Sequence, residues 1–101
     1  MRLRLTSHAR RKLSLLAGLG VTEQAVEETL AAPDEVLCDV AKVERRIAVR
    51  YDKSLVVVYE EAGDEVIVVT VIYVSGLKKL VSRRKRSGRW VECEGKENNT
   101  L

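Results

Sequence analysis

The sequence contains very little of several residue types that define common classes of protein. Phe is absent, Trp and His each occur once, and the only cysteines are Cys38 and Cys93. Two cysteines this far apart make neither a disulfide framework nor a pair of metal ligands, and Gly18 and Gly20 lack the Lys-Ser/Thr partner of a phosphate loop. We therefore expect no metal site, no cofactor and, as the default, reduced cysteines, with a single bridge between the two as the alternative.

Long apolar runs and chemically labile amides are also missing. No stretch approaches the roughly 18 apolar residues of a membrane span, and the basic N-terminus lacks the apolar core of a secretory signal. Asn and Gln total three, whereas 33% of the residues are charged, a combination typical of thermophilic proteins. We expect a cytoplasmic protein of thermophilic type without a membrane partner.

One strong hairpin signal organises the rest of the chain. Two β-rich apolar runs, residues 55–59 and 66–74, flank a polar turn at residues 60–65 that contains Gly63-Asp64. Both runs are apolar on both faces, so we expect central strands that are covered on more than one side. An isolated hairpin is marginally stable in water, and the remaining elements must therefore cover this one.

Two short helices are predicted before the hairpin. Apolar residues at helical spacing predict a helix over residues 8–17, with Thr6 or Ser7 as its N-cap. Thr22 is a good N-cap for a second helix over residues 23–32, which ends before a proline.

Four strands make up the predicted sheet: residues 35–40, 43–51, 55–59 and 66–74. Residues 1–5 are a candidate edge strand. We expect Ile47 to pack under the two helices, which directs Arg46 and Arg50 to the opposite face. The predicted fold is α+β, with two N-terminal helices packed on a four-stranded, mostly antiparallel sheet.

The last basic segment ends the predicted domain. Apolar residues at helical spacing within residues 77–86 indicate a short basic helix, or else a basic tail. Residues 92–101 show no apolar period, and we expect them to be a disordered tail. The chain is therefore predicted to be a single domain over residues 1–91, with residues 76–91 as its basic helix or tail.

Positive charge is concentrated in three blocks of the sequence. Residues 1–20, 42–53 and 76–91 are basic, while residues 21–41 and 60–65 are acidic. If the basic blocks converge in the fold, they form a phosphate-binding face; the alternative is a solvated surface with internal charge pairing.

Several short motifs occur in an order that resembles one known family. They are Thr6-Ser7-His8-Ala9-x-x-Lys12-Leu13, Gly20-Val21-Thr22-Glu23 and Pro33-Asp34-Glu35-Val36, followed by the apolar hairpin. This order resembles a small family of prokaryotic domains related to the RelE/ParE toxins, over about residues 3–74. Lys12 and Leu13 stand where the family motif has Arg and Met, so the positive charge is kept without the bidentate guanidinium.

The resemblance implies a RelE-like fold and a type II toxin that cleaves mRNA on the ribosome without a metal ion, with an antitoxin protein as partner. Such cleavage needs a group that helps the 2′-hydroxyl to attack, cations that stabilise the phosphorane, and an acid for the leaving oxygen. The candidate catalytic residues are His8, Lys12, Arg46, Arg50 and Tyr73.

Each of these candidates has a structural alternative. His8 is the only histidine, and imidazole ordinarily exchanges a proton near neutral pH, but capping or packing of the first helix is equally open. Arg46 and Arg50 are either phosphate ligands or partners of carboxylates across the sheet. Tyr73 is either a catalyst or a core ring.

Clustered cations near the C-terminus favour contact with nucleic acid, because backbone phosphates attract Lys and Arg whatever the base sequence. The predicted nucleic-acid ligands are Arg11, Lys78, Lys79, Arg83, Arg84, Lys85 and Arg86. An acidic face of an antitoxin is the alternative occupant of this surface. Trp90 either stacks on a base or, as the favoured alternative, seals the edge of the core.

Three hypotheses follow. The first is a RelE/ParE-like domain that binds RNA, with an endoribonuclease toxin as its enzymatic form. The second is a non-catalytic nucleic-acid-binding or protein-binding module, which predicts salt-sensitive binding of RNA or DNA without turnover. The third is a homodimer that uses an exposed strand edge.

Overall fold

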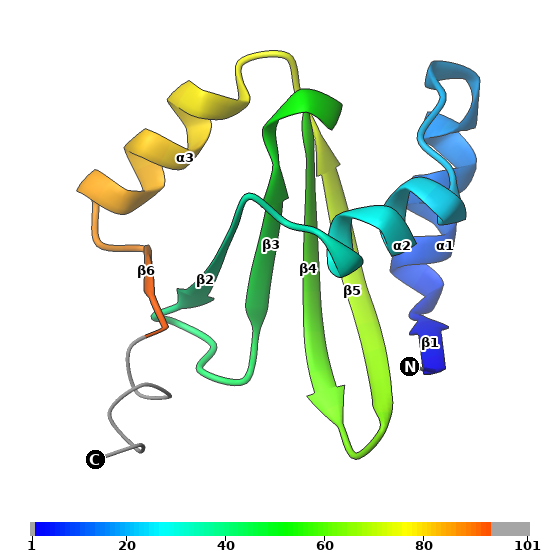
Figure 1. Cartoon of the computed structure of the whole chain (residues 1–101), viewed down its shortest axis with the longest axis horizontal. Helices are drawn as coiled ribbons and strands as arrows, with labels where there is room; N and C mark the ends of the chain where they lie inside the picture. The colour runs from blue at the N-terminus through cyan, green and yellow to red at the C-terminus, as the bar shows by residue number, and fades with distance from the viewer. Residues whose placement is uncertain (1, 94–101) are drawn as a thin grey trace.

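The fold is built around the central hairpin expected from the sequence. The computed structural model describes residues 2–93, which form one sheet with helices on both of its faces (Figure 1). In chain order the elements are β1 (Arg2–Leu5), α1 (Ser7–Leu16), the 3-10 helix η1 (Ala17–Leu19), α2 (Glu23–Ala31), β2 (Glu35–Asp39), β3 (Arg46–Arg50), the 3-10 helix η2 (Tyr51–Lys53), β4 (Leu55–Ala62), β5 (Glu65–Tyr73), α3 (Leu77–Arg86) and β6 (Trp90–Glu92).

The sheet of the described residues has six strands in the order β1-β5-β4-β3-β2-β6. β1 runs parallel to β5, and every other neighbouring pair is antiparallel. The α+β class is therefore confirmed, but the predicted number of four strands is too low. β1 adds to one edge and β6 to the other, and β6 is too short for its alternation to be visible in the sequence.

The central hairpin consists of β4 and β5, which stay paired along their length. The chain reverses at Gly63, whose φ of 64° lies in the left-handed region that glycine adopts without strain. The register shifts between Val58 and Tyr59, which marks a β-bulge. Because of this irregularity, Val68 and Val71 lie on the same face of the sheet, although residues three positions apart in a regular strand point to opposite faces.

Helices cover both faces of the hairpin, so each face has its own apolar core. The core under α1 and α2 consists of Ala9, Leu13, Val21, Val26, Ala48, Leu55, Val57, Val68 and Val71. The core under α3 consists of Leu37, Ile47, Val49, Val56, Val58, Leu77, Val81 and Trp90. This two-sided burial explains why the hairpin strands are apolar on both faces, as the sequence predicted.

The predicted orientation of β3 is wrong. Ile47 and Val49 pack under α3, whereas Ala48 packs under α1 and α2. Arg46 and Arg50 therefore lie on the same face as α1 and α2, and not on the opposite face. The alternation within a strand that is apolar on both sides defines two faces but does not say which helix covers which.

The first two helices begin at the predicted caps. Oγ1 of Thr6 accepts a hydrogen bond from the backbone N–H of Ala9 (3.1 Å), and Oγ1 of Thr22 accepts one from Ala25 (3.2 Å). The N-cap of α3 is Gly76, so this helix begins without a side-chain cap. Its position depends on tertiary contacts more than on local capping.

The edge formed by β6 carries a disulfide between Cys38 of β2 and Cys93. The default expectation of reduced cysteines is thus wrong, because β6 pairs with β2 and brings Cys93 beside it. The predicted tail also begins too early, because Glu92 ends β6 and Cys93 forms the disulfide. Residues 94–101 lie outside the described residues.

Within residues 2–93, no helix is long and apolar enough to cross a membrane.

Candidate nucleic-acid interface

Lys12 is held at the open part of the sheet edge. β1 pairs with β5 only as far as Val68, so the carbonyls of β5 beyond that point face α1. Nζ of Lys12 donates to the carbonyl of Val71 (3.1 Å), and Oγ1 of Thr6 donates to the carbonyl of Val69 (3.0 Å). Lys12 therefore satisfies a backbone acceptor that no strand reaches, which is a structural role.

The two arginines of β3 are also occupied by internal partners. Nε of Arg50 forms an ion pair with Asp52 (2.9 Å), and its Nη1 donates to the carbonyl of Ala32 (3.1 Å). At the other end of β3, Nη1 of Arg46 donates to the carbonyl of Val43 (3.1 Å), and its buried Nε has no partner among the described residues. The two residues are four positions apart along β3, which separates their Cα atoms by about 13 Å.

His8 and Tyr73 complete the set of predicted catalytic residues. His8 is exposed in the first turn of α1, and Tyr73 is 40% exposed at the end of β5. Within residues 2–93, no hydrogen bond or ion pair joins any two of the five candidates. No group of three or more His, Cys, Asp or Glu side chains in this range is arranged to hold a metal ion.

The three basic blocks of the sequence do not converge. In the middle block Arg45 pairs with Glu60 (3.4 Å) and Lys53 pairs with Glu28 (2.9 Å), and the hydrogen bond and charge of Lys53 lower the pKa of Glu28. The first block, which includes Arg11, lies on β1 and α1, on the side of the sheet away from α3. Arg2, Arg10 and Arg11 of the first block also form no ion pair within the described residues, but α3 carries the largest group of unpaired cations on any one element.

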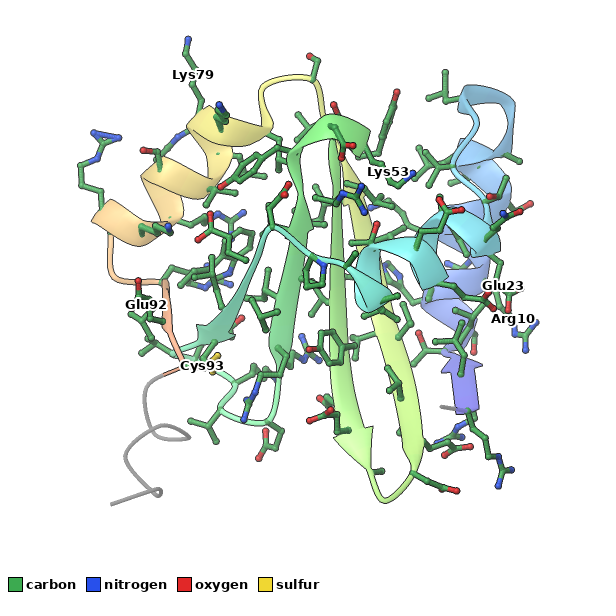
Figure 2. All side chains as sticks on the ribbon, in the orientation of Figure 1. Arg10, Glu23, Lys53, Lys79, Glu92 and Cys93 are labelled. Atoms are coloured by element: carbon green, nitrogen blue, oxygen red, sulfur yellow. A yellow bond between two sulfur atoms is a disulfide. The ribbon has the colours of Figure 1, made fainter. Side chains whose placement is uncertain are left out.

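α3 is basic on its outer side and apolar on its inner side. Leu77 and Val81 are buried in the core beneath it, and six of its ten residues are Lys or Arg. No other labelled element lies beyond α3 at that end of the molecule (Figure 1), and the side chain of Lys79 points away from the body (Figure 2). Together with Ser82, four cations line a shallow hollow on the outer side: Lys78, Lys79, Arg83 and Arg86.

These four cations form the α3 basic face. None of them forms an ion pair within residues 2–93. Lys78 alone has an aromatic neighbour, because its Nζ lies 5.8 Å from the centre of the Tyr51 ring. The α3 basic face is thus open to an external anion.

The two remaining cations of α3 attach the helix to the sheet. The Arg84 guanidinium lies 5.0 Å from the centre of the Trp90 ring, and Nζ of Lys85 pairs with Glu35 of β2 (2.8 Å). Trp90 is only 3% exposed, which confirms that it seals the core. Arg84 and Lys85, both predicted as nucleic-acid ligands, therefore make internal contacts.

A polar cluster next to α3 was not anticipated from the sequence. The Tyr51 hydroxyl donates to Glu35, and burial, followed by this hydrogen bond, raises the pKa of Tyr51 to about 12. Burial alone would raise the pKa of Glu35, but the hydrogen bonds from Lys85 and Tyr51 outweigh it and hold that pKa below its usual value. The three residues are far apart in the chain, and only the β2–β3 pairing and the docking of α3 bring them together.

Comparison with known proteins gave no match to a family model, to a curated protein or to a solved structure. The resemblance to RelE/ParE-related domains therefore stays a prediction.

Proposed function

We propose that this domain binds nucleic acid through the α3 basic face. The observation that carries the proposal is that four cations on the exposed side of one helix have no carboxylate partner within residues 2–93. Phosphate backbones attract clusters of this kind whatever the base sequence. The buried inner side of α3 presents the cations in one direction and holds the helix on the sheet.

Helix stability alone does not account for this charge pattern. Arg83 and Arg86 lie in the last turn, where cations interact favourably with the helix dipole. Lys78 and Lys79, however, lie in the first turn, where the dipole disfavours them, and Lys79 and Arg83 form a like-charge pair at i,i+4. Since α3 contains no acidic residue, the repulsion is uncompensated within the helix.

A membrane surface is a poorer ligand for α3. Basic helices that bind anionic membranes insert an apolar side between the lipid headgroups. In this domain the apolar residues Leu77 and Val81 are already buried against the sheet. Only the charged side of α3 is available to a ligand, and its clustered positive charges complement the negative charges of a rigid polyanion.

The endoribonuclease activity, with mRNA on the ribosome as substrate and an antitoxin as partner, stays a prediction of the RelE/ParE resemblance. Lys12 and Arg50 are engaged in internal contacts, and Arg46 lies at the other end of β3 from Arg50. The proposed function is therefore binding without turnover. Incubating the protein with RNA, in the presence and absence of ribosomes, tests for cleavage directly.

The binding proposal is tested with two matched triple variants. Lys79→Gln/Arg83→Gln/Arg86→Gln removes three charges from the α3 basic face, and the control removes three exposed charges from β1 and α1: Arg2→Gln, Arg10→Gln and Arg11→Gln. We measure affinity for labelled RNA and DNA by fluorescence anisotropy over a series of salt concentrations. The α3 variant should lose about 2 to 3 units of the slope of log K against log salt, because three positive charges that displace the counterions of the nucleic acid are removed.

The control variant should keep both the affinity and the slope. Equal losses in the two variants would show that net charge, and not α3, drives binding. Unchanged binding by the α3 variant would refute the proposed interface. Circular dichroism of both variants checks that the fold is intact.

A further inference from the structure

The exposed side of α3 has the dimensions of a groove-binding helix. Successive residues of an α-helix are about 100° apart, so the residues that line its outer hollow span an arc of about 140°. Lys78 and Arg83 lie at the two borders of this arc, and Ser82, Arg86 and Lys79 lie between them. From Lys78 to Arg86 the arc extends about 12 Å along the helix axis.

Aromatic side chains do not contribute to this surface. Proteins that bind single strands without sequence preference stack the bases on exposed aromatic rings. Trp90 is buried under Arg84, and Tyr51 has Lys78 over its ring and its hydroxyl bonded to Glu35. The other aromatic residues of the described chain, Tyr59 and Tyr73, lie outside the core beneath α3 and do not line its outer hollow.

We infer that the ligand is double-stranded DNA and that α3 lies in its major groove. The inference rests on the proposed function and adds the class of nucleic acid. A helix with its side chains is about 10–12 Å wide, and the major groove of B-form DNA is about 12 Å wide. The corresponding groove of an RNA duplex is deep and narrow and does not admit side chains for reading.

The arrangement assigns different contacts to the two parts of the α3 basic face. Lys78 and Arg83, at the borders of the arc, face the phosphates of the two strands on either side of the groove. Lys79 and Arg86, together with Ser82, face the floor, where O6 and N7 of guanine accept hydrogen bonds from Lys and Arg. Because α3 lies at one end of the molecule, no other labelled element obstructs its entry (Figure 1).

The first test compares four probes of equal length at the same salt concentration: duplex DNA, single-stranded DNA, single-stranded RNA and duplex RNA. Duplex DNA should bind about tenfold more tightly than each of the others, because only its major groove admits α3 to the base edges. Equal or tighter binding of a single strand, or equal binding of the RNA duplex, would overturn the inference while the proposed function stands. If none of the four probes binds, the proposed function itself fails.

The second test compares two double variants that each remove two charges from the α3 basic face. The border variant, Lys78→Gln/Arg83→Gln, should weaken binding to all duplex sequences alike and lower the salt slope by about 2 units. The floor variant, Lys79→Gln/Arg86→Gln, should in addition reduce the difference in affinity between G·C-rich and A·T-rich duplexes. Indistinguishable behaviour of the two variants on all sequences would overturn the placement of α3 in the groove.

Discussion

The disulfide between Cys38 and Cys93 should provide a large part of the stability of this domain. The bridge joins β2 to the residue that follows β6 and closes a loop with a sequence separation of 55 residues. This loop contains β3, β4, β5 and α3, so the bridge restricts most of the unfolded chain. The predicted perturbation is the removal of the bridge, either by reduction or by Cys38→Ser/Cys93→Ser.

Its magnitude follows from the length of the closed loop. In the chain-entropy model, a cross-link over a loop of this length lowers the entropy of the unfolded state by an amount worth about 4 kcal/mol at 25 °C. A small domain has a free energy of unfolding of about 5–15 kcal/mol in total. Removing the bridge should therefore lower that free energy by as much as about 4 kcal/mol.

The assay is urea unfolding of the oxidised protein, the reduced protein and the double-serine variant. Far-UV circular dichroism follows the whole fold. Fluorescence of Trp90 follows the edge strand, because this residue is the only tryptophan and is buried at the start of β6. The two probes separate global unfolding from local opening of β6.

Equal free energies of unfolding in the oxidised and reduced proteins would refute this reasoning. Such a result would mean that the bridge does not restrict the unfolded chain enough to change the free energy of unfolding. A loss confined to Trp90 fluorescence would show that the bridge acts only on the edge strand. The double-serine variant controls for effects of the reductant itself.

Two further predictions concern polar contacts between the helices and the sheet. Lys12→Met should lower the free energy of unfolding by about 1 kcal/mol, measured in urea, because the carbonyl of Val71 loses its donor; an unchanged value would show that water replaces the ammonium group. The pKa of Tyr51 is raised from 10.0 to about 12, so its stabilising contribution is complete below pH 10 and is lost as the pH rises through about 12. Tyr51→Phe should abolish this part of the alkaline loss of stability, and an identical pH profile in the variant would contradict the assigned contact with Glu35.

Local patterns were sufficient to predict most of the secondary structure. The caps at Thr6 and Thr22 and the turn at Gly63 lie where the sequence placed them. Each of these features depends on a few neighbouring residues, so a short stretch of sequence contains the necessary information. The basic helix at the C-terminal side is visible for the same reason, through the helical spacing of its apolar residues.

The candidate site was predicted only in part. Lys78, Lys79, Arg83 and Arg86 are exposed on α3, but Arg84 and Lys85 of the same run make internal contacts. Charge density along a sequence does not say which cations a distant carboxylate or ring will meet. Glu35 and Trp90 reach these two residues only because β2 and β6 lie beneath the helix.

By itself, the sequence determined the identity and the approximate limits of the helices and of the central hairpin, because hydrophobic period, caps and turn residues act over a few positions. Only the tertiary structure decided that α3 covers Ile47, that Cys38 meets Cys93, and that the first and last basic blocks lie on opposite faces of the sheet. These outcomes depend on strand order and on which face each helix covers. Both are set by contacts between segments far apart in the chain, which no local pattern specifies.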